Sequence, residues 1–256
     1  MNVILLQCTP EPERLVALAA RLCYSPASID DLREDISRKD VRNLVRRVLS
    51  LGHASVLEHV TFTFGVEGIS RATSHQLVRH RIASYSQQSQ RYVAAAFGYV
   101  TPRSLAPGEP DREGRDGIRP RGGERLYDRF ERHMRRSSEL YEEMLASGIP
   151  AEDARFVLPS AAETKIMISM NARELQHFFS LRLCRRAQWE IREMAGRMLA
   201  IARERAPLLF EKAGPGCLRG RCPEGKMSCG DAAGVRKEYG AQTGPGGGRL
   251  PGRGNA

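Results

Sequence analysis

Val60-Thr61-Phe62-Thr63-Phe64-Gly65-Val66 is a stretch in which every second residue is apolar. Successive side chains of a strand point to opposite faces of a sheet, so this alternation predicts a β-strand with one buried side. A second strand is predicted over 164–170, and the apolar run Val3-Ile4-Leu5-Leu6 predicts a short buried strand near the N-terminus. The fold is therefore expected to contain a sheet.

Helical periodicity occupies most of the remaining sequence. Helices are predicted over 10–22, 38–51, 70–80, 124–146, 172–182 and 187–206. Pro10 is expected to begin the first, Gly52 to end the second and Ser70 to cap the third. Asn171-Ala172-Arg173-Glu174 resembles a capping box with Asn as its first residue.

One polar stretch combines three arginines with serine, glutamine and tyrosine and contains no carboxylate: Arg79-His80-Arg81-Ile82-Ala83-Ser84-Tyr85-Ser86-Gln87-Gln88-Ser89-Gln90-Arg91-Tyr92. From Gly68 to Gly108 there are five arginines and no Asp or Glu. Arginine presents a planar fork of donors that suits phosphate and carboxylate groups. A solvated basic loop or a nucleic-acid patch is the alternative, but such surfaces usually mix charge signs and use Lys. The stretch favours a dedicated anion pocket.

Two parts of this stretch are expected to differ in structure. Gln76, Arg79 and His80 fall at i, i+3 and i+4, which would place them on one face of the predicted helix 70–80. Leu77 and Val78 are expected to pack inward. Residues 84–91 are expected to form a polar loop, where binding residues often lie.

The overall composition indicates a globular protein. The chain has 256 residues, of which 41% are hydrophobic and 27% charged, and this suits one large domain or two small ones. Residues 68–108 contribute +5 and residues 214–256 contribute +4 to a net charge of +10, so the excess is local. The absence of a long apolar run and of a basic leader predicts a cytoplasmic protein that does not bind a membrane.

The C-terminal residues have a different composition. Thirteen of the 24 glycines lie in residues 214–256, which show no sustained periodicity, so a domain over 1–213 and a flexible tail over 214–256 are predicted. Cys217, Cys222 and Cys229 in this tail are interpreted as reduced thiols. A metal clip completed by a fourth ligand such as Cys8 is the alternative.

Other candidate chemistries find less support. His53, Glu58 and His59 could suggest zinc, but their spacing fits no helical pairing that would direct both imidazoles to one metal, and no metal site is predicted. The sequence has no G-x-S-x-G elbow and no phosphate-binding glycine loop. An arginine-rich pocket without an evident nucleophile suits a reaction in which a cofactor carries out the difficult step.

The helix predicted after Asn171 brings further cations into consideration. Arg182 falls on or beside its apolar face, where an unpaired charge would be costly. Arg173 and His177 share the adjacent face. These cations either pair with acids elsewhere in the chain or bind an anionic ligand.

The arrangement Arg79-His80-Arg81, seven residues, then Ser89 and Arg91 resembles the signature of flavin-dependent thymidylate synthases. The resemblance extends over residues 3–214 and includes five more segments, 52–59, 62–64, 154–159, 171–173 and 181–190. It implies an α/β (α+β) fold with a mainly antiparallel sheet flanked by helices. It also implies a homotetramer with active sites where subunits meet.

The reaction that the resemblance implies is the reductive methylation of dUMP to dTMP. Methylenetetrahydrofolate would supply the carbon, and NADPH would supply reducing equivalents through FAD. Arg182 would polarise the uracil ring without an enzyme nucleophile, and His53 would border the flavin. The alternative function is a basic nucleic-acid-binding protein that uses residues 79–92 and the tail, although its local charge argues against that.

The resemblance also assigns ligands to individual residues. The implied FAD contacts are Arg79, His80, Arg81, Ile82, Ser55, Glu58, Asn171, Arg173 and His177. The implied dUMP contacts are Gln76, Gln87, Ser89, Arg91, Arg155 and Arg182. Some relatives carry Glu in place of Gln87 and Asn in place of His177, so the contacts of these two residues are left open.

Overall fold

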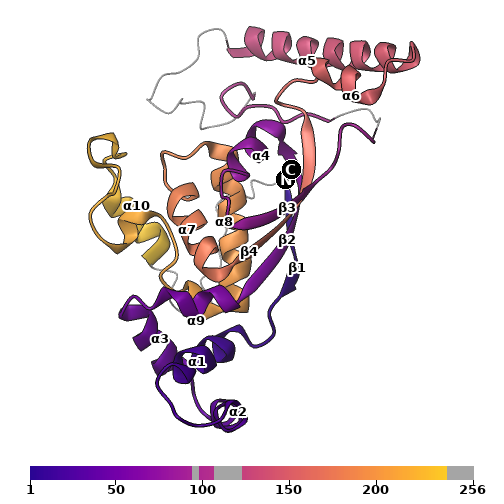
Figure 1. Ribbon diagram of the computed structural model, residues 1–256. Helices are drawn as coiled ribbons and strands as arrows, with labels where there is room; N and C mark the ends of the chain where they lie inside the picture. Colours follow the sequence, from indigo (N-terminus) through magenta and orange to yellow (C-terminus); the bar gives the residue numbers. More distant parts are fainter. Residues whose placement is uncertain (94–97, 107–122, 241–256) are drawn as a thin grey trace. The chain divides into compact units, whose positions relative to one another are not determined.

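The computed structural model describes residues 1–93, 98–106 and 123–240. Four strands form one antiparallel sheet in the order β1-β2-β4-β3, and helices flank it, which confirms the predicted fold class (Figure 1). The strands are β1 (Asn2–Cys8), β2 (Thr61–Ser70), β3 (Ala83–Gln87) and β4 (Glu163–Asn171). Among the described residues, no helix is long and apolar enough to cross a membrane.

The two central strands match the sequence patterns that predicted them. Phe62, Phe64 and Val66 of β2 are buried, as are Ile166 and Ile168 of β4. The N-terminal strand exists, but its predicted burial is wrong, since Ile4 and Leu6 are each 48% exposed. The strand β1 lies at the edge of the sheet, so it has a neighbouring strand on one side only.

Contacts along the chain define two compact units. Unit 1 comprises residues 1–2, 66–79 and 86–167, and unit 2 comprises 3–65, 80–85 and 168–256.

Unit 1 contains the helices α4 (Arg71–Leu77), α5 (Gly123–Ala146) and α6 (Ala151–Ala154) and the short 3-10 helix η2 (Arg155–Val157). The long helix confirms the prediction over 124–146, with Met134 and Tyr141 buried on its inner side. Leu126 was expected on that side but is exposed. The helix α5 packs against α6 and η2.

The helix predicted over 70–80 is shorter than expected. Ser70 caps α4 by accepting a hydrogen bond from the Thr73 amide at 3.1 Å, as predicted, but the helix ends at Leu77. Leu77 is buried, whereas Val78, also expected to pack inward, is exposed. The prediction that Gln76, Arg79 and His80 share one face of this helix is therefore wrong, because Arg79 and His80 lie beyond its end.

The predicted loop 84–91 is wrong in its first part. Ala83–Gln87 form β3, a strand whose side chains are serine, tyrosine and glutamine rather than the apolar residues that mark strands in sequence. The segment thus has the composition of a loop and the backbone of a sheet edge, and periodicity could not distinguish the two.

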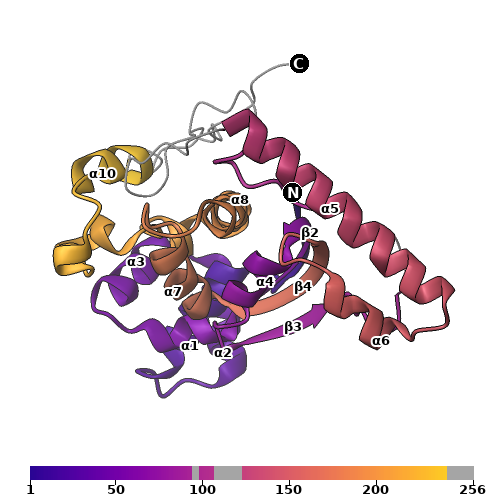
Figure 2. The same ribbon diagram turned by 90° about the horizontal axis from the view of Figure 1, so that it is seen from above.

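Unit 2 contains most of the helices. They are α1 (Pro12–Leu22), α2 (Ile29–Arg38), α3 (Arg42–Ser50), η1 (Ala54–His59), α7 (Ala172–Arg182), α8 (Trp189–Arg205), α9 (Pro207–Phe210), η3 (Gly216–Arg219), η4 (Gly225–Met227) and α10 (Ala232–Gly240). The helices α7 and α8 pack side by side (Figure 2).

Several predicted helix boundaries in unit 2 need correction. The first helix begins at Pro12 rather than Pro10, with proline in its first turn as expected. The helix predicted over 38–51 is α3 alone, preceded by a separate helix α2 that the sequence analysis missed. Gly52 ends α3 with a φ of 81°, a left-handed conformation that favours glycine. Asn171 caps α7 by accepting from the Glu174 amide at 2.8 Å.

An aromatic core links β2 to α7 within unit 2. The ring of Phe210 meets those of Phe62 and Phe179 edge-on, with centroid distances of 5.4 Å and 5.9 Å. Phe178 continues this cluster to the imidazole of His80 at 5.0 Å. Each of these side chains is buried, so the start and the middle of α7 have a rigid apolar support.

Part of the segment predicted to be a flexible tail has regular secondary structure, whereas the division at residue 214 and the flexibility stay predictions. The segment forms η3, η4 and α10, and α10 packs on η3 with Val235 buried. Arg185 pairs with Asp231 and lies 3.4 Å from Glu238, which ties this segment to the turn after α7. Residues 241–256 lie outside the described residues, as does 107–122 of the connection before α5.

Candidate functional site

A largely buried, hydrogen-bonded polar group of unit 2 is centred on His80. Its Nδ1 lies 3.1 Å from a carboxylate oxygen of Glu174, and Arg182 Nε donates to its Nε2 at 3.0 Å. Glu174 is in the first turn of α7 and Arg182 is the last residue of that helix, whereas His80 follows α4 in the chain. The side chains of His80 and Glu174 are 3% and 8% exposed.

These contacts define the protonation state of His80. A guanidinium group has donors only, so the Nε2 atom that accepts from Arg182 carries a lone pair. The proton of a neutral ring is then on Nδ1, where it is donated to Glu174. Burial lowers the pKa of His80 below 6.5, an effect opposed by the Glu174 hydrogen bond and reinforced by the Arg182 charge. His80 is therefore neutral at physiological pH.

Tyr85 of β3 joins this group. Its hydroxyl donates to the backbone carbonyl of His80 at 2.8 Å. Burial, followed by the charge of Glu174, raises the pKa of Tyr85, while Arg182 lowers it. The tyrosine thus stays protonated as a donor and fixes the backbone at His80.

Most of the residues predicted to bind FAD also lie in unit 2, all except Arg79. Arg81 and Ile82 follow His80 and are exposed, Ile82 by 69%. Glu58 on η1 forms an ion pair with Arg173 of α7, so two predicted cofactor residues pair with each other. Arg173 thus has an acidic partner within the chain, and its binding of an anionic ligand stays a prediction.

The other predicted residues of unit 2 lie near the same helix. His53 and Ser55 are exposed at the start of η1, which packs against α7. His177 is exposed one turn after Arg173, with its ring centroid 5.8 Å from that of His80. The cofactor set is therefore spread over the N-terminal part of α7 and the two segments beside it.

The predicted dUMP residues, except Arg182, lie in unit 1. Gln87 donates to Ser74 Oγ at 2.9 Å and to Thr164 Oγ1 at 3.1 Å, so it is firmly held. The Ser89 hydroxyl accepts from the Arg91 amide at 3.1 Å. Gln76 donates to the Ala72 carbonyl at 3.2 Å within α4.

Two cations of this set contact one acidic residue. Arg91 lies 3.0 Å from the Glu152 carboxylate, with side chains that are 50% and 49% exposed. Arg155 Nε donates to the backbone carbonyl of Glu152 at 3.0 Å. Both interactions are exposed to solvent, so a phosphate could replace the carboxylate at little cost.

Arg71 is a site residue that the sequence analysis missed. One of its terminal nitrogens donates to the Gln88 carbonyl at 2.9 Å, whereas its Nε is buried and has no hydrogen-bond partner among the described residues. Burial and the charge of Arg155 lower its pKa. A buried donor without a partner can accommodate an acceptor, and the nearby charge of Arg155 favours an anionic one. Its place in the acid-free stretch 68–108 was the available signal.

Glu174 was also missed as a functional candidate. The sequence suggested that its side chain would complete a capping box, but its carboxylate binds His80 instead. No spacing rule connects His80 to a glutamate 94 positions later, so this contact required the fold.

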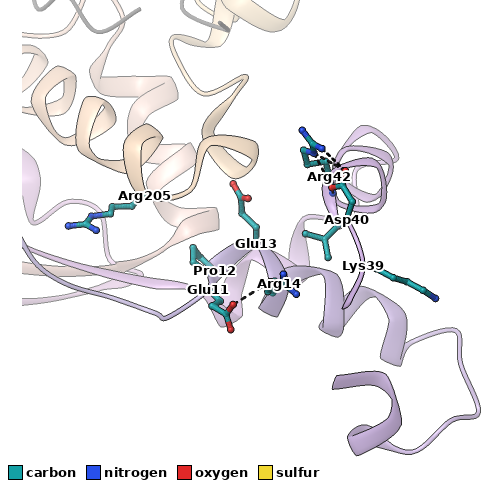
Figure 3. A pocket seen from close by; sticks show the side chains of 9 residues that line it. Glu11, Pro12, Glu13, Arg14, Lys39, Asp40, Arg42 and Arg205 are labelled. Atoms are coloured by element: carbon teal, nitrogen blue, oxygen red, sulfur yellow. Dashed lines mark hydrogen bonds and ion pairs between the residues drawn. The ribbon is translucent and has the colours of Figure 1, made fainter. Parts of the chain in front are cut away.

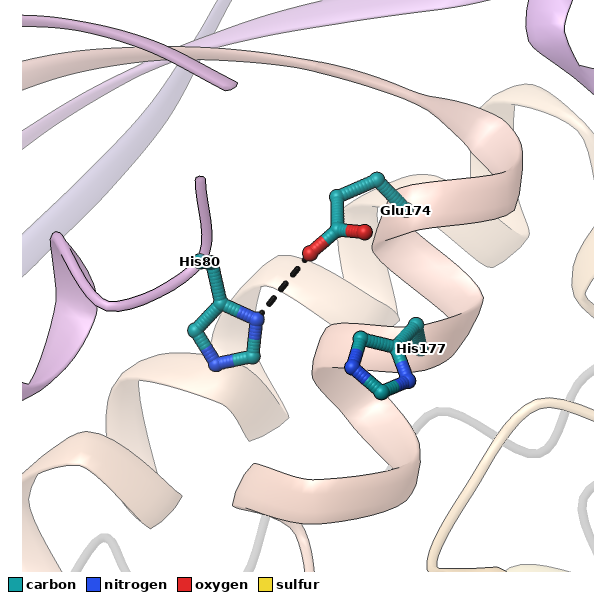
Figure 4. Close-up of side chains that lie close together, drawn as sticks. All are labelled: His80, Glu174 and His177. Carbon is teal, nitrogen blue, oxygen red and sulfur yellow. Dashed lines mark hydrogen bonds and ion pairs between the residues drawn. The ribbon is translucent and has the colours of Figure 1, made fainter. Parts of the chain in front are cut away.

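A metal is not supported at this group, although the ligand atoms of His80, Glu174 and His177 lie within 4.8 Å of one another (Figure 4). Both ring nitrogens of His80 are occupied, and the neighbouring Arg182 would repel a cation. The absence of a metal site stays a prediction.

The cysteines of unit 2 gather differently from the predicted clip. Cys184, Cys222 and Cys229 lie close enough to Cys217 to raise the pKa of its thiol, although burial contributes more. The neighbouring cysteine from outside the segment 214–240 is thus Cys184. The described cysteines are all free thiols, and the metal alternative stays a prediction.

A surface hollow between α1 and α3 contains none of the predicted residues. It is lined by charged side chains, several of which pair with sequence neighbours, for example Arg14 with Glu11 at 3.3 Å and Arg42 with Asp40 at 2.7 Å (Figure 3). Because these charges are already paired locally, the hollow is not assigned a ligand.

Comparison with known proteins agrees with this geometry. Residues 4–208 match the family model described as thymidylate synthase complementing protein. A flavin-dependent thymidylate synthase of Geobacter sulfurreducens is 55% identical over 242 residues, covering 93% of this chain and 98% of that protein. Proteins of the same name from Clostridium tetani and Pyrococcus abyssi are 46% and 44% identical, covering 93% and 89% of this chain and 97% and 91% of theirs.

The fold, the cationic residue sets and these matches define the class as the thymidylate synthase complementing proteins. More particularly, the chain belongs to the flavin-dependent thymidylate synthase family.

Proposed function

We propose that this protein converts dUMP to dTMP with methylenetetrahydrofolate as carbon donor, NADPH as reductant and FAD as bound cofactor. The methylene group has the oxidation level of formaldehyde, so its conversion to a methyl group requires one hydride equivalent. NADPH supplies that equivalent by way of the flavin, and the folate leaves as tetrahydrofolate. The uracil C5 proton is released.

The residues of unit 2 fit the chemistry of FAD. The exposed guanidinium group of Arg81 suits the pyrophosphate, and Arg173, with its ion pair to Glu58, can exchange a carboxylate for a phosphate. The exposed side chain of Ile82 offers an apolar surface for an aromatic ring. FAD, when bound, would supply the hydride. The described residues show no activated nucleophile, which suits a reaction whose difficult step is carried out by a cofactor.

The residues of unit 1 support binding of the nucleotide phosphate. The single observation that carries this proposal is the buried Nε of Arg71, which faces Arg155 and has no partner among the described residues. A dianionic phosphate would satisfy it, and Arg91 and the Ser89 hydroxyl are available in the same unit.

Arg182 is proposed to act on the uracil ring. It is fixed by the neutral ring of His80, and burial lowers its pKa while Tyr85 raises it, so the guanidinium stays charged in a partly dry setting. A cation held near a carbonyl oxygen of uracil stabilises negative charge on the ring and makes C5 more nucleophilic.

Two assays test the proposal. The purified protein should absorb as a flavoprotein, and it should release tritium from [5-³H]dUMP only when NADPH and methylenetetrahydrofolate are both present. A protein that stays colourless after incubation with FAD and releases no tritium would overturn it. Tight, salt-sensitive binding of oligonucleotides without flavin would instead support the nucleic-acid alternative.

A homotetrameric assembly and a cytoplasmic location are part of the same proposal. A homotetramer with active sites at subunit interfaces would expose each site to residues of another copy, Arg155 and Arg182 included. Sedimentation of the holoenzyme tests this state. A cytoplasmic location suits the soluble substrates dUMP and NADPH.

A further inference from the structure

Glu174 is a buried carboxylate to which the reaction as proposed gives no role. It belongs to a chain of three side chains, Glu174, His80 and Arg182, joined by hydrogen bonds of 3.1 Å and 3.0 Å. Glu174 and Arg182 carry opposite charges, and each of them is hydrogen-bonded to the imidazole that lies between them.

We propose that Glu174 is a positioning residue for Arg182, which it orients through the ring of His80. This inference rests on the proposed function, in which Arg182 acts on the uracil ring. It goes beyond the contacts implied for His80, since it assigns that residue a duty toward Arg182 and introduces Glu174 as the group that controls it.

The physical reason is the choice between two tautomers of neutral histidine. A proton on Nε2 would point toward the donor Nε–H of Arg182, and two donors repel each other. A proton on Nδ1 leaves the Nε2 lone pair free to accept from Arg182. Glu174 can only accept when ionised, so it selects the Nδ1–H tautomer and thereby gives Arg182 its acceptor.

The surroundings of His80 are suited to this role. Glu174, His177 and Arg182 face the ring from α7, and Tyr85 of β3 binds its backbone carbonyl at 2.8 Å. Phe178 packs edge-on against the ring at 5.0 Å and restricts its rotation. The imidazole is thus fixed from several directions, and the Glu174 acceptor and the Arg182 donor together favour the proton on Nδ1.

The test uses the FAD-loaded enzyme and the variant Glu174→Gln. Glutamine has nearly the same shape but no charge, and it can present either an acceptor or a donor to Nδ1, so the preference that Glu174 adds for the Nδ1–H tautomer is lost. We expect kcat/KM for dUMP to fall about 10- to 100-fold, the effect of losing a hydrogen bond to a charged group, while FAD content stays within about twofold of wild type.

The pH profile separates positioning from mere support of the fold. Protonation of His80 removes the acceptor for Arg182, so wild-type activity should fall at a pH below 6.5. The Glu174 carboxylate favours the protonated ring, so its neutralisation should move this acid limb to lower pH. If Glu174 only supported the fold, the variant would lose thermal stability while the acid limb of its pH–activity profile stayed at the wild-type position, which would contradict the proposal.

Glu190→Gln is the matched control. Glu190 is a buried carboxylate of α8, 2% exposed, and its neutralisation is comparably disruptive to packing. We expect it to alter thermal stability and to leave the acid limb unchanged. An equal shift of the limb in this variant would show that the effect is not specific to Glu174.

A double-mutant cycle with Arg182→Ala gives the decisive readout. Binding of dUMP to the oxidised holoenzyme is measured by calorimetry for wild type, both single variants and the double variant. If Glu174 acts through Arg182, the change Glu174→Gln should weaken dUMP binding when Arg182 is present. The same change made in the Arg182→Ala variant should have no further effect on binding. Additive losses would overturn the proposal.

Two further outcomes are distinguishable. If Glu174→Gln yields no folded holoenzyme, Glu174→Asp takes its place in the same cycle. Aspartate keeps the charge, so the acid limb of its pH profile should match that of wild type while kcat/KM falls. A shifted acid limb would contradict the proposal. A wild-type protein that makes no dTMP would instead defeat the proposed function, before any variant is compared.

Discussion

The two units of the chain hold their polar site residues in opposite ways. In unit 2, Glu174, His80 and Arg182 are linked to one another, and two of the three side chains are less than 10% exposed. In unit 1, Arg91 and Glu152 form an ion pair in which both side chains are about half exposed. The first arrangement is fixed by packing, and the second is held by contacts that water and ions can replace.

This difference corresponds to two tasks. A group that stabilises charge on a reacting ring must be oriented before substrate arrives, because reorganisation during the reaction would cost free energy. A group that binds a phosphate can exchange partners as the ligand enters. Arg71, which is intermediate in burial, shares features of both, since it is held by the Gln88 carbonyl yet keeps a buried Nε without a partner among the described residues.

The largest effect is expected from Arg182→Ala. Loss of the cation that is proposed to act on the uracil ring should lower kcat/KM for dUMP by about 1,000-fold, the loss that follows removal of a preorganised donor to a developing anion. FAD content, measured by absorbance, should stay near wild type. Parallel loss of flavin would place Arg182 in the cofactor site and remove the distinction between the two sets.

Arg71→Ala should have the next largest effect. Removal of a buried phosphate donor should raise the KM for dUMP about 10- to 100-fold, with a smaller change in kcat. Arg136→Ala, an exposed arginine of α5 in the same unit, is the control and should leave KM unchanged. If deoxyuridine and dUMP lose affinity equally in Arg71→Ala, the residue does not recognise phosphate.

The sequence predicted the sheet and the long helices because their apolar residues follow one period. The strands β2 and β4 and the helices α5, α7 and α8 were found in this way. The strand β3 was missed, since its residues are polar and it is recognised only by its pairing with β4. The elements within 216–240 were missed because the segment is rich in glycine, its helical turns are short, and its buried residues, Cys217 and Val235, follow no period.

Site residues followed the same division. Arg79, His80, Arg81, Ser89 and Arg91 lie close together in sequence, and their motif could be recognised. The link from Glu174 to His80 spans 94 positions, and the unsatisfied state of Arg71 depends on burial, so neither could be read from spacing. Local sequence identifies chemical groups, whereas their pairing is a property of the tertiary structure.

Arg81→Ala should affect the cofactor rather than the nucleotide. The side chain is exposed and follows His80 directly, so its loss should weaken FAD binding by about 10-fold, as for one charge-assisted hydrogen bond, and leave the fold intact. Fluorescence titration of the apoprotein with FAD measures this. An unchanged flavin affinity would show that Arg81 does not belong to the cofactor set.

The buried group should also make stability depend on pH. Burial holds the pKa of folded His80 below 6.5, whereas the unfolded residue takes up its proton near that value. The contribution to stability is therefore complete above pH 6.5 and is lost as pH falls toward the folded pKa, by about 1.4 kcal/mol for each pH unit that separates the folded and unfolded pKa values. Urea denaturation between pH 7.5 and 5 should show this loss, and His80→Gln should reduce it.

His59→Gln provides the control for that measurement. His59 is an exposed histidine of η1 in the same unit, and its removal should leave the pH dependence of unfolding unchanged. If both variants reduce the dependence equally, the effect arises from general charge and not from the buried imidazole. The pH dependence of unfolding would then no longer support the contrast between the buried group of unit 2 and the exposed ion pair of unit 1.

The smallest effect is expected from Glu152→Gln. An exposed ion pair contributes at most about 1 kcal/mol, so its loss should barely change stability. Since the carboxylate competes with the substrate phosphate for Arg91, its neutralisation should lower the KM for dUMP by up to about threefold. A rise in KM of more than tenfold would mean that Glu152 positions Arg91 as Glu174 is proposed to position Arg182. Both units would then orient their cations in advance, and exposure would not distinguish them.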